Sequence, residues 1–180
     1  MATGDFAALK KSVIDAGLCT RCGGCVGVCP DKALAIDDVL GECLPVQIDA
    51  CSECGLCHEA CSGKEVSFPQ LNESVFGRQP ANKLLGNYRN LFVGHASDNG
   101  VRSRGASGGV ITAALKYLLE QGKVDGAIVL AMDEGQPWVS KPIIARTPEE
   151  VQAAAQSKYS LSPVNTILAE LEHEEGRFAY

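Results

Sequence analysis

All nine cysteines of this 180-residue chain lie between residues 19 and 61. Eight of them form two runs with one spacing, C-x2-C-x2-C-x3-C. The first run is Cys19, Cys22, Cys25 and Cys29, and the second is Cys51, Cys54, Cys57 and Cys61. Each cysteine of the second run follows its counterpart by 32 positions. The segment is therefore an internal duplication.

The spacing predicts iron–sulfur clusters. Three cysteines two residues apart let one tight loop place three thiolates around a compact cluster, and a cubane needs a fourth ligand. In two-cluster ferredoxins the fourth cysteine of each run ligates the other cluster. We therefore expect two [4Fe–4S] clusters, and structural zinc or a disulfide scaffold fits this spacing less well. The ligand sets are Cys19, Cys22, Cys25 and Cys61 for one cluster, and Cys51, Cys54, Cys57 and Cys29 for the other.

The residues around the cysteines refine this prediction. The stretches ALAI and LPVQI flank a turn and predict a short hairpin. Glycines at 23, 24, 27 and 55 are expected to let the loops pass close to the sulfides, where backbone N–H groups bond to sulfur. Cys43 fits neither run and is expected to be a small buried side chain in the hairpin. His58 is expected to be a solvated loop residue.

Composition excludes several classes of protein. The net charge is -6 and no long basic run exists, so nucleic acid is not an expected partner. No stretch approaches 18 consecutive apolar residues, so we expect no transmembrane segment. The first residues lack the order of a secretory signal, which favours a cytoplasmic location. In that compartment a dense cysteine cluster binds metal more often than it forms disulfides.

The chain changes character after the cysteine segment. Residues 69–90 mix Pro, Gly, Asn and Gln and predict a linker. The stretch LFVGHAS at 91–97 predicts a strand, and a helix is expected from an N-cap at Ser107 to Gly122. The apolar run GAIVLAM then predicts a buried strand. This unit contains strand, glycine-rich turn, helix and strand.

The glycine-rich turn has the features of an anion site. Glycines at 105, 108 and 109 allow close approach of a ligand, and the free N–H groups of a helix start favour a phosphate. Arg102 and Arg104 add positive charge just upstream. The motif is neither G-x-G-x-x-G nor a P-loop, so an ordinary helix after a loop stays the alternative.

The last third predicts two more helices and a strand. One helix starts at Thr147 with a capping box to Glu150, and the other runs from Ser162 to Gly176. The loop SKYSLSP between them is either a solvated connector or a contact for an anion or ring. His95 is expected to be structural and His173 to lie on the surface. The final GRFAY predicts the beginning of a strand, so we expect this α/β domain to be incomplete at the C-terminus.

The order of these parts resembles the beta-subunit family of coenzyme F420 hydrogenases and dehydrogenases. The resemblance rests on the double cysteine run, the block SGGVITAAL and the block SKY, in that order. It implies an α+β protein: a bacterial-type 2[4Fe–4S] ferredoxin domain at 1–68, a linker at 69–90 and the N-terminal part of a flavin-binding α/β domain at 91–180. It also implies FAD, bound by a set of residues matched to the family motifs together with the nearby arginine. That set is Arg104, Ser107, Gly108, Gly109, Ser157, Lys158 and Tyr159.

The resemblance implies an oxidoreductase subunit that moves electrons between a hydride carrier, either deazaflavin coenzyme F420 or a nicotinamide, and two clusters by way of FAD. The expected partners are other redox subunits of hydrogenase, formate dehydrogenase or heterodisulfide reductase type. No general acid or base is visible among the residues. The alternative is a flavin-free, ferredoxin-type subunit that links partner oxidoreductases, and flavin content separates the two.

Overall fold

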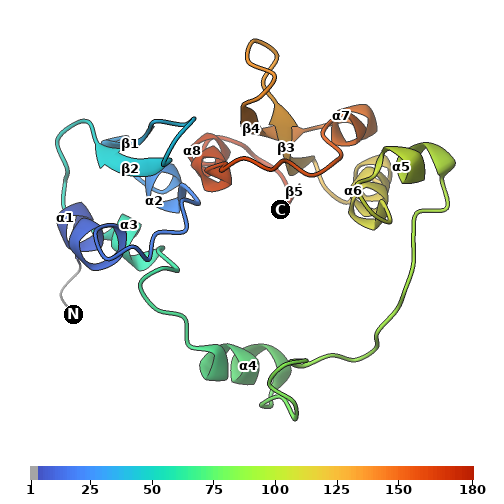
Figure 1. The fold of residues 1–180 in the computed structure, drawn as a ribbon, viewed down its shortest axis with the longest axis horizontal. Coiled ribbons are helices and arrows are strands. Elements are labelled where there is room, and N and C mark those ends of the chain that lie inside the picture. The colour runs from blue at the N-terminus through green and yellow to red at the C-terminus, as the bar shows by residue number, and fades with distance from the viewer. Residues whose placement is uncertain (1–3) are drawn as a thin grey trace.

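The computed structural model describes residues 4–180, which form two folded units joined by a long connecting segment (Figure 1). The first unit, residues 4–63, carries all the cysteines. The second unit, residues 96–180, is built on a three-stranded sheet. The chain is thus an α+β protein with a cysteine-bearing unit followed by an α/β unit, as the sequence predicts. Among the described residues, no helix combines the length and the apolar character that a membrane crossing requires.

The first unit is a β-hairpin flanked by short helices. β1 and β2 pair antiparallel, with Leu34 opposite Gln47 and Asp37 opposite Leu44. This confirms the hairpin predicted from two apolar stretches. The elements in chain order are α1 (Phe6–Leu9), the π-helical turn η1 (Lys10–Ile14), α2 (Gly24–Gly27), β1 (Leu34–Asp37), β2 (Leu44–Gln47) and α3 (Leu56–Glu59).

The N-terminal helix closes the core of this unit, and it is not among the predicted elements. The Asp5 carboxylate caps α1 by accepting a hydrogen bond from the N–H of Ala8 at 2.7 Å. Phe6, Leu9 and Val13 share one helix face at spacings of three and four, and all are buried. They pack with Cys57 in one apolar cluster. The helix therefore covers the cysteine loops with hydrocarbon.

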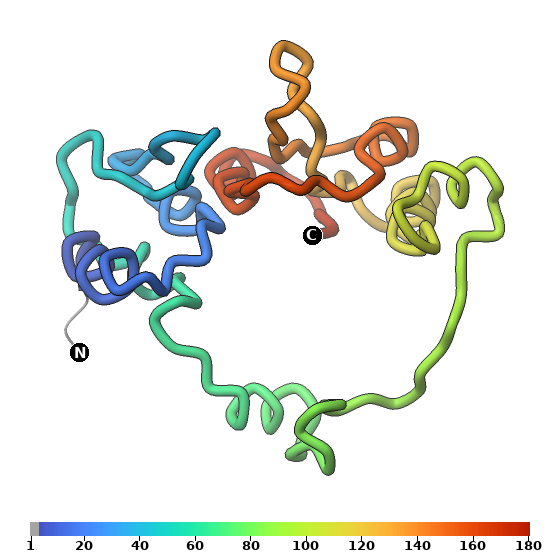
Figure 2. The backbone as a smooth tube through the Cα atoms, in the orientation of Figure 1, coloured from blue at the N-terminus to red at the C-terminus, as the bar shows by residue number. Residues whose placement is uncertain are grey.

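The connecting segment contains a helix that is absent from the predicted elements. The expected linker at 69–90 is partly helical, because α4 covers Phe68–Phe76. Pro69 in its first turn and Gly77 at its end, with φ 64°, are ordinary start and stop signals. The tube in Figure 2 shows this segment as an arc that runs away from both units. Large apolar side chains such as Phe92 and Val93 are exposed along it.

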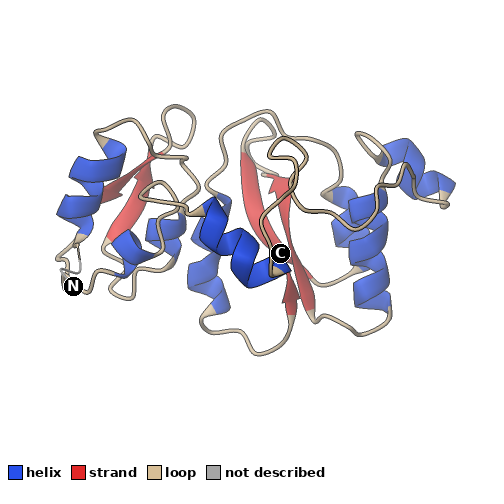
Figure 3. Cartoon of the chain, turned by 90° about the horizontal axis from the view of Figure 1, so that it is seen from below, coloured by secondary structure: helices blue, strands red, loops and turns tan. Residues whose placement is uncertain are grey.

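The second unit has helices on both sides of a small sheet (Figure 3). β3 is central, antiparallel to β4 and parallel to β5. Leu115 and Leu119 of α6 and Val151 of α7 pack with Ala127 and Ala145 in one apolar cluster. The elements are α5 (Asn99–Arg104), α6 (Val110–Glu120), β3 (Gly126–Met132), β4 (Ser140–Ala145), α7 (Pro148–Ala153), the 3-10 turn η2 (Val164–Ile167), α8 (Leu168–Leu171) and β5 (Phe178–Ala179).

Several predicted elements of this unit are confirmed. β3 is the predicted buried strand, and β5 lies within the final GRFAY, where the beginning of a strand is expected. The capping box of α7 is present, with Glu150 N–H bonded to Thr147 Oγ1 at 3.2 Å and Thr147 N–H bonded to Glu150 Oε2 at 3.1 Å. Gly122 ends α6 in the left-handed region with φ 57°.

Three predictions for this unit are wrong. Residues 91–97 form no strand, because Leu91, Phe92 and Val93 find no neighbouring strand and stay exposed. Ser107 is not the N-cap of α6: Gly109 is, with φ 71°, and α5 occupies part of the expected turn. The helix expected over 162–176 is shorter and irregular, since η2 begins at Val164 and α8 ends at Leu171.

Candidate cluster and cofactor sites

The first predicted ligand set lines one small enclosed cavity. Cys19, Cys22, Cys25 and Cys61 all contribute to its wall. The rest of the wall is mostly apolar and includes Leu9, Val13 and Pro45. Cys61 comes from the second run, so the structure brings together the crossed set that the two-cluster pattern predicts.

The second ligand set surrounds Cys57. This cysteine is buried beside α1 and η1, and Cys29 and Cys51 pack against the same cluster. Burial raises the pKa of the Cys57 thiol, and the neighbouring thiols of Cys51, Cys54 and Cys29 raise it further. Cys29 thus lies close to Cys57 of the other run, as the crossed arrangement requires.

The electrostatics of the first set favour a cationic guest. Burial raises the pKa of Cys25 to about 12, and the nearby thiols of Cys22 and Cys19 add to the effect. Thiolates gathered around one mostly apolar cavity repel one another unless positive charge compensates them. Iron supplies that charge and drives the thiols to deprotonate on binding.

The backbone of each run is shaped to donate to sulfur. The N–H of Arg21 lies 3.4 Å from Cys19 Sγ, and the N–H of Glu53 lies 3.4 Å from Cys51 Sγ. Both residues have positive φ, 60° and 57°. The N–H of Gly24 approaches Cys22 Sγ at 3.5 Å. Such bonds orient cluster ligands and tune cluster potentials.

These features fit a polynuclear cluster at each set. The four cysteines of the first set are spread around a cavity wall, and a cube of four irons offers each thiolate its own corner. Cys43, the ninth cysteine, is fully buried in the hairpin as predicted, with its Sγ 3.3 Å from the Val39 carbonyl oxygen.

The glycine-rich segment lines a second cavity at the start of α6. Its volume is about 310 Å3, and its wall is formed by residues 105–112 with Gly94, Gln156 and Ser157. The structure therefore brings Ser157 to the Ser107, Gly108 and Gly109 segment. The first N–H groups of α6 have no partner within the helix and are available to a phosphate there.

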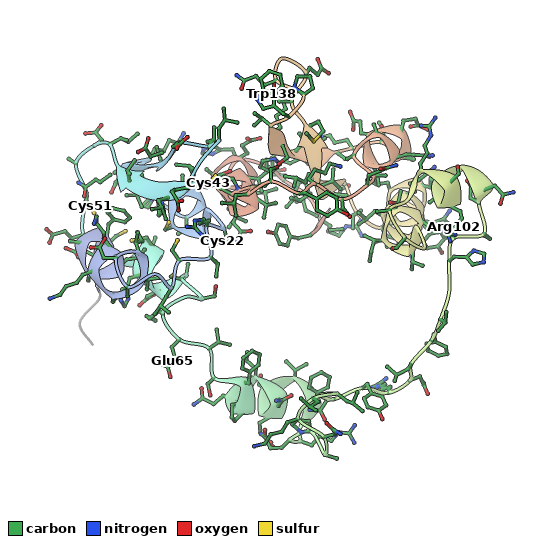
Figure 4. The ribbon with its side chains drawn as sticks, viewed as in Figure 1. Cys22, Cys43, Cys51, Glu65, Arg102 and Trp138 are labelled. Atoms are coloured by element: carbon green, nitrogen blue, oxygen red, sulfur yellow. The ribbon has the colours of Figure 1, made fainter. Side chains whose placement is uncertain are left out.

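The glycines have packing roles that their sequence pattern does not reveal. A Cβ on Gly108 would lie 2.9 Å from the Gly94 carbonyl oxygen, and one on Gly105 would lie 3.1 Å from Gly109 Cα. The Arg102 guanidinium donates to the Ser107 carbonyl oxygen and so braces this turn. Figure 4 labels Arg102 beside α5. These glycines are needed for the turn to close on itself, whatever ligand it binds.

Three predicted cofactor residues lie outside this cavity wall. Arg104 is exposed at the end of α5. The Lys158 ammonium donates to the carbonyl oxygens of Ala154, Ala155 and Gln156, and so satisfies the end of α7. Tyr159 is almost fully exposed. Lys158 and Tyr159 line an adjoining cavity instead, together with Met132 and Trp138.

Three adjoining cavities connect α6 to the hairpin of the first unit. The cavity of about 400 Å3 at Lys158 shares Gln156 and Ser157 with the cavity at α6. It shares Trp138 and Ser160 with a third cavity of about 340 Å3, whose wall also includes residues 39–41 of the β1–β2 turn.

Comparison with known proteins assigns both halves of the chain. Residues 91–169 match the family model described as coenzyme F420 hydrogenase/dehydrogenase, beta subunit N-term. Residues 11–62 match the model of a 4Fe-4S dicluster domain. The two matches account for most of the second unit and for all eight cysteines of the two runs.

Several curated proteins are similar to this chain. It is 31% identical to the coenzyme F420-dependent sulfite reductase of Methanocaldococcus jannaschii over 87% of the chain and 22% of that protein. It is 36% identical to the coenzyme F420 hydrogenase subunit beta of Methanosarcina barkeri over 51% of the chain and 31% of that protein. It is 28% identical to a subunit of the F(420)H(2) dehydrogenase of Methanosarcina mazei over 93% of the chain and 46% of that protein.

The chain spans less than half the length of each of these relatives. The resemblance in the motifs, the two family matches and these identities agree with one another. Residues 11–62 are a 4Fe-4S dicluster domain, and residues 91–169 belong to the N-terminal region of the beta-subunit family of coenzyme F420 hydrogenases and dehydrogenases.

Proposed function

We propose that the chain is an iron–sulfur flavoprotein subunit of a redox complex that moves electrons between a hydride carrier and two [4Fe–4S] clusters by way of FAD. The observation that carries the proposal is the pair of crossed cysteine sets in one unit, next to a second unit whose groove reaches that first unit. A hydride brings two electrons together, whereas each cluster takes one at a time. A protein with both kinds of site therefore suits conversion between the two.

In this proposal the eight cysteines hold the clusters. Cys19, Cys22, Cys25 and Cys61 bind one cluster, and Cys51, Cys54, Cys57 and Cys29 bind the other. The apolar side chains of Phe6, Leu9 and Val13 pack against cysteines of both sets. The N–H groups of residues 21, 24 and 53 donate to the ligand sulfurs. Burial and these bonds set the reduction potentials.

The glycine-rich cavity is the proposed cofactor site. The start of α6, with Ser107, Gly108 and Gly109, would hold the pyrophosphate, and Ser157 on the facing loop would close the same wall. The adjoining cavity at Trp138 and Tyr159 leaves room for the ring system. FAD would supply the step between hydride and single-electron chemistry. Arg104 and Lys158, by their placement, would act on the cofactor only after rearrangement.

The names of two relatives, an F420 hydrogenase beta subunit and a component of an F420H2 dehydrogenase, support reduced deazaflavin as the hydride carrier. The same names support assembly with further redox subunits of hydrogenase or related type. We place this relay in the cytoplasm, because closely spaced cysteines that form no disulfides persist in a reducing compartment.

Cofactor content on anaerobically purified protein tests the proposal. Iron is measured by colorimetry and acid-released flavin by fluorescence on the same sample. About eight irons and one flavin per chain are expected. Zinc in place of iron would overturn the cluster assignment. A control variant, Gly109→Val, places a branched side chain at φ 71° against Val101 and removes flavin while leaving iron unchanged.

The second candidate is a flavin-free electron carrier between partner oxidoreductases. The placement of Lys158 favours it, because its ammonium group is occupied by backbone carbonyls and leaves the groove without that cation. The protein is purified in the presence of added FAD, and unbound FAD is removed before the measurement. Eight irons and no bound flavin would then select this candidate.

A further inference from the structure

The second unit contacts the first cysteine loop through a short stretch of chain, residues 160–168, which we name the docking segment. It includes η2 and the first residue of α8. The N–H of Asn165 donates to the carbonyl oxygen of Cys22 at 2.8 Å. The side chain of Cys43 lies 4.0 Å from the Leu161 carbonyl oxygen. The docking segment thus touches the first cysteine loop directly.

Glycines of the first run make this approach possible. A Cβ on Gly27 would lie 2.0 Å from the Asn165 carbonyl oxygen and 3.0 Å from Leu168 Cβ. A Cβ on Gly23 would lie 2.8 Å from Thr166 Cγ2. Gly27 is buried as a result. Backbone packed on backbone at this distance leaves no room for a side chain or for water.

The position of the second run that is equivalent to Gly27 is open. Glu59 stands where the first run has Gly27, and it is exposed. Cys54 is exposed, whereas its counterpart Cys22 is partly covered. In Figure 4, Cys22 lies on the side of the first unit that faces α8, and Cys51 lies on the far side.

The docking segment is itself held from the second unit. The Tyr180 hydroxyl donates to Asn165 Oδ1, which ties the segment to the residue after β5. The Ser140 hydroxyl of β4 bonds with those of Ser160 and Ser162. Ile167 of the docking segment is itself buried. The contact with Cys22 is therefore anchored on the sheet that also carries the groove.

From these contacts we infer that the two cluster sites are ranked: the Cys19, Cys22, Cys25 and Cys61 site is the inner one, which exchanges electrons with the second unit, and the site with Cys54 is the outer one, which faces a partner. This ranking rests on the proposed function. The two electrons of a hydride pass in succession, each reducing the inner cluster and then the outer cluster, and the proton is released to solvent. The partner that accepts them is an oxidised redox protein docking at the Cys54 face.

A pair of matched variants tests the ranking. Gly27→Ala forces the docking segment away from the inner site, and Glu59→Ala places the same residue at the equivalent, exposed position of the outer site. Leu168→Glu disrupts the same contact from the second unit, outside the cysteine loops. If Gly27→Ala binds less iron than the wild type, Leu168→Glu is used in its place to test the ranking. Each protein is assayed for iron, for hydrogen exchange of the peptide 160–168, and for the rate at which reduced coenzyme F420 bleaches the clusters.

Gly27→Ala and Leu168→Glu are expected to raise exchange in the peptide 160–168 and to slow bleaching several-fold, because electron transfer slows steeply as the distance between donor and acceptor grows. Glu59→Ala is expected to change neither. Electron paramagnetic resonance spectra are recorded on the dithionite-reduced proteins, and the signal that is lost in Cys22→Ser identifies the inner cluster. In Gly27→Ala and Leu168→Glu, only that signal should be altered. An unchanged rate in both contact variants despite raised exchange, or equal slowing in Glu59→Ala, overturns the ranking.

The proposed function fails separately. If wild-type protein with eight irons is not reduced by coenzyme F420, the hydride relay is wrong. The exchange and resonance measurements then still decide the ranking: a change in the Cys22 cluster supports it, and a change in the Cys54 cluster contradicts it.

Discussion

The two cysteine runs have the same ligand spacing and nearly the same loop backbone, but only one of them is packed against the rest of the protein. Gly23 and Gly55 both adopt left-handed conformations, with φ 78° and 80°. Arg21 and Glu53 do the same, with φ 60° and 57°. These shared features belong to the loop that wraps a cluster.

The differences between the runs belong to packing. Gly24 and Gly27 of the first run correspond to Leu56 and Glu59 of the second. Neither Gly24 nor Gly27 has a positive φ, so the loop conformation does not require glycine there. The docking segment requires it at Gly27. A glycine in a duplicated motif therefore indicates a requirement of the loop conformation only where both copies have glycine at that position.

The largest predicted effect tests whether the runs exchange their fourth ligands. Because Cys22 and Cys61 line the same cavity, the double variant Cys22→Ser/Cys61→Ser is expected to lose one cluster and keep about four irons. Cys22→Ser/Cys29→Ser damages both sets and is expected to retain almost none. Iron content by colorimetry separates the two. The reverse result would show that each run holds its own cluster.

The second prediction separates two neighbouring glycines of the first run. Gly27→Ala is expected to lower stability by about 3 kcal/mol, the upper part of the usual range for overpacking, because its Cβ meets backbone at 2.0 Å. Gly24→Ala is expected to be neutral or to stabilise by about 0.5 kcal/mol, since its Cβ finds Cys22 Sγ at 3.6 Å and suits a helix. The thermal midpoint of the cluster-loaded protein, scanned at one fixed rate, measures both. Equal midpoints would contradict the packing role of Gly27.

The third prediction concerns the cysteine outside both runs. Cys43→Ala is expected to leave about eight irons, because Cys43 Sγ lies against Val39 and Leu161 rather than in a ligand set. The small cavity left in the hairpin is expected to cost about 1 kcal/mol. Iron content and the thermal midpoint test both parts. Loss of four irons would make Cys43 a ligand and break the symmetry of the runs.

The sequence predicts the first unit well because ligand spacing constrains it. Eight cysteines at fixed intervals define which residues share a cavity, and no long-range information is needed. The N-terminal helix can also be predicted from the sequence, since Phe6, Leu9 and Val13 have helical spacing and Asp5 is a good N-cap. Its signal is weak because the helix is only one turn followed by a π-helical turn.

The second unit is less predictable because tertiary contacts decide its local structure. Residues 91–93 have strand propensity but find no strand to pair with. β4 is not among the predicted strands, and Pro142 weakens the strand pattern of its sequence. In the structure β4 pairs with β3 at the edge of the sheet, where a proline is tolerated. Lys158 is expected at a cofactor, but the carbonyls at the end of α7 compete for its ammonium group. The docking segment has no motif at all, and only the clash at Gly27 reveals it.

The smallest predicted effect lies where the runs are most alike. Arg21 and Glu53 are both non-glycine residues in the left-handed region, which asparagine tolerates better. Glu53→Asn is therefore expected to stabilise by about 0.5 kcal/mol while its N–H still donates to Cys51 Sγ. Arg21→Asn gains the same relief but loses the ion pair with Glu42 at 2.5 Å, a pair of the exposed kind worth about 0–1 kcal/mol, so its net effect is expected to be near zero.

The rate of cluster loss at a fixed temperature resolves changes of this size better than an equilibrium midpoint, because unfolding of a cluster protein is irreversible. A slower loss in Glu53→Asn and an unchanged loss in Arg21→Asn are expected. One more variant isolates the contribution of the ion pair. Glu42→Gln removes the ion pair alone, and its change in the rate of cluster loss should equal the difference between the two asparagine variants. If Arg21→Asn instead stabilises as much as Glu53→Asn, the ion pair contributes nothing and the two loops are equivalent in energy as well as in shape.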